Sequence, residues 1–165
     1  NERVNFEYFP DGLIKVKQAA NVKLEFTHDS TTKKVALVKA SFLNEKGKVI
    51  STRQTSFKYD PKGNLTYAEN SDGQKITMTY DIKGRISSIT DQAKKLVKID
   101  YEERFGKPST VTRPGLGTVK VTYKPNGDIA KVDSAEGPSV ASQVASTFNN
   151  LLDVISPATQ ELYLL

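Results

Sequence analysis

Tyrosines and lysines that recur along the chain are the residues whose types and spacing best suit a binding surface. Four tyrosines are separated by 21, 21 and 22 residues, and lysines lie in three of the short segments between such a tyrosine and the next glycine. On a covered face the tyrosines would be core residues with a hydroxyl group, whereas on an open concave face they could bind sugar rings or acyl chains. Lysines at hairpin tips could form a positive rim for lipid phosphates or acidic glycans, or could prevent edge pairing and keep the protein soluble. The candidate binding residues are Tyr59, Tyr80, Tyr101, Tyr123, Lys62, Lys83 and Lys124.

The sequence offers little for catalysis or metal binding. The single histidine, His28, stands beside Asp29 and Ser30, but members of a catalytic triad usually come from separate segments, so we expect a histidine in a hairpin loop. No two carboxylates are marked as a converging acid and base, since Glu102 and Glu103 would point to opposite faces of a strand. The absence of cysteine excludes thiol nucleophiles, disulfides and cysteine-based metal sites. We therefore predict no catalytic residue, no metal ligand and no cofactor.

Length and composition indicate an ordered single domain. The chain has 165 residues, 37% of them hydrophobic, and a net charge of +5 that is spread over the sequence. The hydrophobic fraction is too high for a disordered chain, and no apolar run approaches the roughly 20 residues of a membrane-spanning helix. We expect no nucleic-acid binding, because the aromatic residues are predicted on the buried face rather than among exposed basic residues.

Alternating apolar residues predict the elements that position these side chains. Ile76, Met78 and Tyr80 stand at every second position, and the same pattern precedes the other recurring tyrosines. A period of two predicts a strand with one apolar face. Each Tyr-x-x-x-Gly unit then forms a hairpin tip, in which Asp60 and Asp81 accept hydrogen bonds from backbone N–H groups. With second turns at residues 70–73, 91–94 and 114–117, the chain predicts an antiparallel meander of about twelve strands, curved or partly closed, with a tyrosine ladder on one face.

The composition changes after Gly137. Apolar residues at positions 140, 144, 148, 151, 152 and 155 share one helical face, Ser139 is a suitable N-cap, and Pro157 ends the pattern. We predict one domain over residues 1–165, made of a meander at 1–137 and a helix at 138–157 that packs on the apolar face of the sheet.

The hairpin units resemble a known repeat. Tyr59-Asp60-Pro61-Lys62-Gly63-Asn64-Leu65 and Tyr80-Asp81-Ile82-Lys83-Gly84-Arg85-Ile86 are the best copies, residues 101–106 and 123–129 are relaxed copies, and weaker copies lie at 8–14 and at Phe42 with Gly47. These units are similar to the YD repeats of the Rhs family. That resemblance implies β-strips that spiral into hollow shells or wrap other elements, in bacterial proteins that are exported or on the cell surface, including carriers of polymorphic toxins.

The sequence and this resemblance are compatible with three functions. The first is a non-catalytic, secreted, periplasmic or cell-surface module that acts as a scaffold or binding surface for a protein or glycan partner. The second is a carrier that encloses a lipid or another amphiphile between the sheet and the helix. The third is a fragment of a larger Rhs-type toxin-carrier shell.

Overall fold

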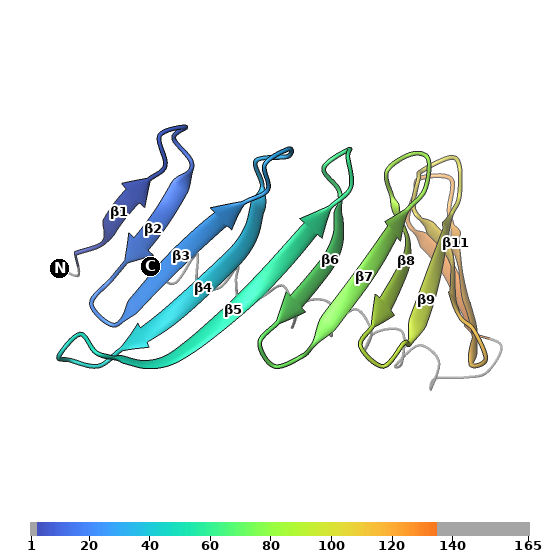
Figure 1. Cartoon of the computed structure of the whole chain (residues 1–165). Helices are drawn as coiled ribbons and strands as arrows, with labels where there is room; N and C mark the ends of the chain where they lie inside the picture. The colour runs from blue at the N-terminus through green and yellow to red at the C-terminus, as the bar shows by residue number, and fades with distance from the viewer. Residues whose placement is uncertain (1–2, 135–165) are drawn as a thin grey trace. The chain divides into compact units, whose positions relative to one another are not determined.

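The computed structural model describes residues 3–134, all of whose regular elements are β-strands (Figure 1). Twelve strands follow one another in a sheet of order β1 to β12, which confirms the predicted antiparallel meander. They are β1 (Asn5–Tyr8), β2 (Ile14–Gln18), β3 (Val22–His28), β4 (Val35–Leu43), β5 (Val49–Tyr59), β6 (Leu65–Asn70), β7 (Lys75–Tyr80), β8 (Ile86–Asp91), β9 (Leu96–Tyr101), β10 (Pro108–Arg113), β11 (Gly117–Tyr123) and β12 (Ile129–Ser134).

The sheet does not close. Among the described strands, β1 and β12 each have a single neighbour, because every connection is a hairpin to the next strand and none returns the chain to β1. The predicted partial closure is therefore wrong for these residues. The predicted helix at 138–157 and the boundary at 137 lie outside the described residues. Within residues 3–134, the structure has no helix long and apolar enough to cross a membrane.

The described residues form two compact units, residues 3–75 and residues 76–134. In the first unit, Leu24 of β3 stands opposite Ala40 of β4, and Phe26 stands opposite Val38. All four side chains are buried in one cluster, against which Ile14, Val22, Val35, Phe42 and Phe57 pack. The period of two thus places one face of each strand in the core.

The second unit has a core of the same kind. Ile89 of β8 stands opposite both Met78 of β7 and Val97 of β9. Val111 of β10 stands opposite both Ile99 and Val119. These side chains are buried, so apolar rows run across neighbouring strands and hold their register.

One predicted repeat copy is misplaced. The turn after Phe42 closes between Asn44 and Lys48 and follows an even-numbered strand, so it belongs with the turns at 70–74 and 91–95. The second copy of the repeat lies instead at residues 28–34, where His28 is the last residue of β3 and takes the place of the tyrosine. The prediction missed this copy because residues 28–34 contain neither the tyrosine nor the glycine of the repeat, and the tip is one residue longer than the tip after Tyr59.

Two turn positions with positive φ offer a stability test. Gly84 has φ of 78° with open space around it, and Lys94 adopts φ of 59° in the turn after β8. We expect Gly84→Ala to destabilise the chain by about 1 kcal/mol, since a Cβ disfavours this conformation. Lys94→Gly should raise stability by a few tenths of a kcal/mol or more, as the relief of backbone strain exceeds the entropy cost of glycine. Urea unfolding of the two variants checks this, and a loss for both would contradict it.

Candidate functional site

The loops after the odd-numbered strands, here called the Tyr-side tips, carry the repeated side chains. They span residues 9–13, 29–34 and 60–64 in the first unit and residues 81–85, 102–107 and 124–128 in the second. Each tip is closed by a hydrogen bond from the N–H of its first residue to the C=O of its last, at 2.7–2.9 Å. The six tips therefore share the same closing hydrogen bond, although their sequences differ.

Carboxylates at the first tip position hold the turns. Asp81 Oδ1 accepts the N–H groups of Lys83 and Arg85, both at 2.9 Å, and Oδ2 accepts Arg85 Nε at 2.7 Å. Asp60 Oδ1 accepts the N–H groups of Lys62 and Asn64 in the same way. The predicted acceptor role of both aspartates is confirmed. These bonds hold the carboxylate pKa below its usual value, chiefly through the Asn64 side chain for Asp60 and the Arg85 N–H for Asp81.

These lowered pKa values predict acid sensitivity. A group whose pKa is lower in the folded chain contributes stability above its unfolded pKa and loses that contribution as the pH falls through its folded pKa. We expect the urea midpoint to fall progressively below about pH 4. A chain carrying both Asp60→Asn and Asp81→Asn keeps an acceptor oxygen at each site and should show a shallower fall. If the urea midpoints of the parent chain and of the double variant fell equally between pH 5 and pH 2, this prediction would be contradicted.

Three of the four candidate tyrosines tie neighbouring strands together. The hydroxyls of Tyr59, Tyr101 and Tyr123 donate to the C=O groups of Val35, Ile86 and Pro108, at 2.7, 2.6 and 2.7 Å. Each acceptor is the first residue of the preceding strand. The rings are half-buried, and burial raises the pKa of Tyr59 and Tyr101, which favours the neutral hydroxyl donor. Tyr80 is also half-buried, at the end of β7.

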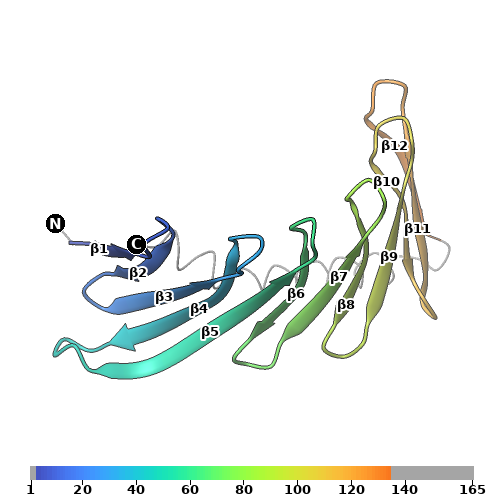
Figure 2. The ribbon, with the colours of Figure 1, turned by 45° about the horizontal axis from the view of Figure 1, so that its top comes forward.

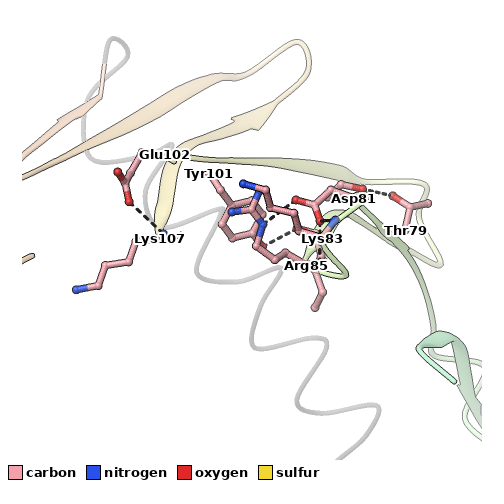
Figure 3. A network of polar contacts seen from close by, with 9 residues as sticks. Thr79, Asp81, Lys83, Arg85, Tyr101, Glu102 and Lys107 are labelled. Atoms are coloured by element: carbon pink, nitrogen blue, oxygen red, sulfur yellow. Dashed lines mark hydrogen bonds and ion pairs between the residues drawn. The ribbon is translucent and has the colours of Figure 1, made fainter. Parts of the chain in front are cut away.

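Basic residues at the last tip position complete the contact. The Arg85 guanidinium lies against the Tyr101 ring (Figure 3), and its carbon is 4.3 Å from the ring centroid. Lys34 Nζ lies 5.7 Å from the Tyr59 centroid and donates to Gly63 C=O at 2.7 Å. Lys107 Nζ lies 5.5 Å from the Tyr123 centroid and donates to Gly127 C=O at 2.6 Å. Each of these tyrosines therefore makes two contacts: a hydrogen bond from its hydroxyl to a backbone C=O and a contact between its ring and a cation. We call the two contacts together the hairpin lock.

Sequence reasoning missed the cations of the lock. The available signal was a basic residue in the last tip position, which three of the six tips share: Lys34, Arg85 and Lys107. The predicted lysines lie elsewhere. Lys62 and Lys83 are exposed at the third position of their tips. Lys124 is exposed at the first position of its tip, which is the position that Asp60 and Asp81 occupy in theirs. A shared positive rim of these lysines stays a prediction, because Lys62 belongs to the first unit and the other two to the second.

The lock is absent between the first two tips. Leu13 takes the position of the cation and His28 that of the tyrosine, beside a cavity of about 250 Å³ that both residues line. The His28 ring meets Phe9 edge-on, and His28 Nδ1 is buried with no hydrogen-bond partner among the described residues. Asp29 bonds within its own turn, to Thr31 and Thr32, so the structure does not assemble His28, Asp29 and Ser30 into a triad.

Restoring the lock should stabilise the first unit. In His28→Tyr the new hydroxyl is expected to reach the C=O of Ile14, the first residue of β2, as Tyr59 reaches Val35. One such bond contributes about 1 kcal/mol, and adding Leu13→Lys should add several tenths through the ring contact. His28→Phe is the matched control, because it supplies a ring without the hydroxyl. Urea unfolding in which the tyrosine variant is no more stable than the phenylalanine variant would contradict this prediction.

Comparison with known proteins explains the repetition. The family model described as Teneurin YD-shell matches residues 4–165. The chain belongs to the teneurin YD-shell family. The described residues are thus YD-shell repeats, a structural shell fold. The resemblance to Rhs-type YD repeats inferred from the sequence is confirmed.

Solved structures share the YD-shell fold at low identity. In the crystal structure of TcdB2-TccC3-Cdc42, the matched region has a TM-score of 0.52 and 12% identity, over 81% of this chain and 9% of that chain. The Tc holotoxin pore of Photorhabdus luminescens gives 0.50 and 13%, over 80% and 9%. This chain therefore spans about a tenth of the length of these structures. Among curated proteins no match was found.

Proposed function

We propose that this chain is a non-catalytic wall segment of a larger YD-repeat shell, which encloses or scaffolds another polypeptide. The observation that carries the proposal is the hairpin lock, which recurs at Tyr59 in the first unit and at Tyr101 and Tyr123 in the second. The lock joins a hairpin to the previous one at these three places, so it ties neighbouring parts of the strip together and uses its polar groups internally. Such an arrangement suits a wall and leaves few groups free for chemistry.

The length of the relatives supports the same proposal. The chain corresponds to 9% of the TcdB2-TccC3-Cdc42 and Tc holotoxin chains, so a shell of that kind requires many more repeats than twelve strands supply. We also propose that the protein is secreted, periplasmic or on the cell surface of a bacterium, as its resemblance to Rhs-type YD repeats implies. The alternative function is a free-standing scaffold that binds a surface protein or glycan and encloses no polypeptide.

Limited proteolysis of the native protein, recovered from envelope and medium fractions, tests enclosure. A shell wall predicts that a second polypeptide segment survives digestion with the repeats and becomes digestible in urea at the concentration at which the repeats unfold. Survival of the YD-repeat region alone, with no co-protected segment, would contradict enclosure and would favour the free-standing scaffold.

A further inference from the structure

The cavity beside His28 lies where the hairpin lock is absent. Figure 2 shows the loops 9–13 and 29–34 at one edge of the first unit, opposite the turns that join β2 to β3 and β4 to β5. The cavity of about 250 Å³ is lined by residues of both loops, and Phe9 and Leu13 supply apolar surface. Pockets for drug-sized ligands have volumes of about 300–1,000 Å³, so this cavity suits a short apolar chain with one polar group.

The next pair of tips shows which polar group the repeat places at this position. Lys34, the last residue of its tip, holds Nζ 5.7 Å from the Tyr59 ring centroid and donates to Gly63 C=O at 2.7 Å. Lys107 makes the same two contacts in the second unit. The position therefore takes an ammonium group, held between an aromatic ring and a backbone carbonyl.

The first pair of tips keeps the carbonyl but lacks the cation. Lys33 corresponds to Gly63, because each has a positive φ and each donates its N–H to the C=O of the first residue of its tip. The Lys33 C=O therefore holds the place of the Gly63 C=O, and no described residue donates to it. Leu13 holds the place of Lys34 and carries no charge.

The charges around the cavity favour a cation. Two carboxylates, Asp11 and Asp29, line it against one ammonium, Lys33, which leaves an excess of negative charge in a chain whose net charge is +5. Lys15 Nζ lies 6.0 Å from the Phe9 ring centroid, but Lys15 does not line the cavity. A negative, partly apolar recess attracts a positively charged ligand.

Both carboxylates have an oxygen left for a ligand. Asp11 Oδ1 accepts the Leu13 N–H at 3.1 Å, and Asp29 Oδ1 accepts the Thr32 N–H at 2.6 Å and its hydroxyl at 2.8 Å. No described residue donates to Oδ2 of either aspartate. Hydrogen bonds between an ammonium group and a carboxylate are among the stronger ones in proteins.

We propose that the cavity between the first two tips binds a primary ammonium group carried on a short alkyl chain. The N–H groups donate to the Lys33 C=O and to the carboxylates of Asp11 and Asp29, and the alkyl chain contacts Phe9 and Leu13. A lysine side chain of another polypeptide and a free small amine both carry this group. The proposal does not depend on the wall function, because both tips belong to the first unit.

The single histidine of the chain reports on the cavity, because all histidine ring signals in a proton NMR spectrum come from His28. The probe is n-butylammonium chloride, added at constant ionic strength to the untagged 165-residue chain at about pH 8, where an ordinary imidazole is neutral and an alkylamine is charged. We expect a saturable shift of the His28 signals in the millimolar range. The matched control n-butanol, which has the same chain without the charge, should bind at least about tenfold more weakly.

Two positions test where the ligand binds. Leu13→Lys supplies the cation from the chain itself and should weaken binding by about tenfold or more, whereas Leu13→Met keeps an apolar side chain of similar volume and should bind as the parent does. Asp11→Asn keeps an oxygen that accepts the Leu13 N–H and should weaken binding severalfold. Circular dichroism selects variants that keep the parent spectrum.

A further probe, Nα-acetyl-lysine N-methylamide, distinguishes the two sources of the ammonium group. Binding as tight as that of butylammonium would assign the cavity to a lysine side chain, and much weaker binding would assign it to a small amine. The proposal would be overturned by the lack of a saturable shift with butylammonium or by equal binding of butanol. Equal binding by the Leu13→Lys and Leu13→Met variants would also overturn it.

Discussion

Leu24→Ala is expected to lower the free energy of unfolding of the first unit by about 2–5 kcal/mol. Leu24 has no exposed surface and lies at the centre of the cluster formed with Phe26, Val38 and Ala40. Its neighbours belong to paired strands whose register is fixed, so they can only partly fill the space that the missing atoms leave. The lost burial and the remaining cavity both contribute to the loss.

Urea unfolding followed by circular dichroism measures this effect. Ile50→Ala is the matched control, since Ile50 lies in the same unit but is 67% exposed, and its truncation should change stability by no more than about 0.5 kcal/mol. Equal losses for the two variants would contradict the placement of the core on the Leu24 face.

Tyr101→Ala is expected to destabilise the second unit by about 2–3 kcal/mol, below the range for a fully buried aromatic residue because the ring is half-buried. Truncation removes the hydroxyl bond to Ile86 C=O, at 2.6 Å, and the ring beneath Arg85, at 4.3 Å. Tyr101→Phe removes only the hydroxyl and should cost about 1 kcal/mol. The difference between the two variants reports the packing of the ring.

A double-mutant cycle separates the two parts of the lock. With Arg85→Gln as the second change, the coupling energy to Tyr101→Ala should be about 0.5–1 kcal/mol, and the coupling to Tyr101→Phe should be smaller because the ring remains. No coupling in either cycle would contradict the contribution of the cation to the lock.

The strands and tips were predictable because their signals are local. Alternation around Met78 and Ile99 marks the buried face, and Asp81 with Gly84 marks a turn that needs a backbone acceptor and a positive φ. Each of these features depends on residues within one hairpin, and the sequence shows them directly.

The hairpin lock was not predictable in full because it joins two hairpins. Whether Arg85 reaches Tyr101 depends on the stagger between their tips, which the spacing within one repeat does not reveal. His28 was missed as a repeat position because the tip after it has one extra residue and no glycine, with Lys33 instead at φ of 60°. Residues 49–53 of β5 pair only with β4 among the described strands, because β5 has 11 residues and β6 has six.

The intact mass of the endogenous protein tests the wall-segment account most directly. The 165 residues correspond to 18.2 kDa. The account predicts that the native protein, identified by peptides from both units and measured in envelope and medium fractions, has a mass several-fold larger, because a shell requires many more hairpins than this chain contains. A native mass near 18.2 kDa in both fractions would contradict it and would leave a self-contained YD-repeat scaffold.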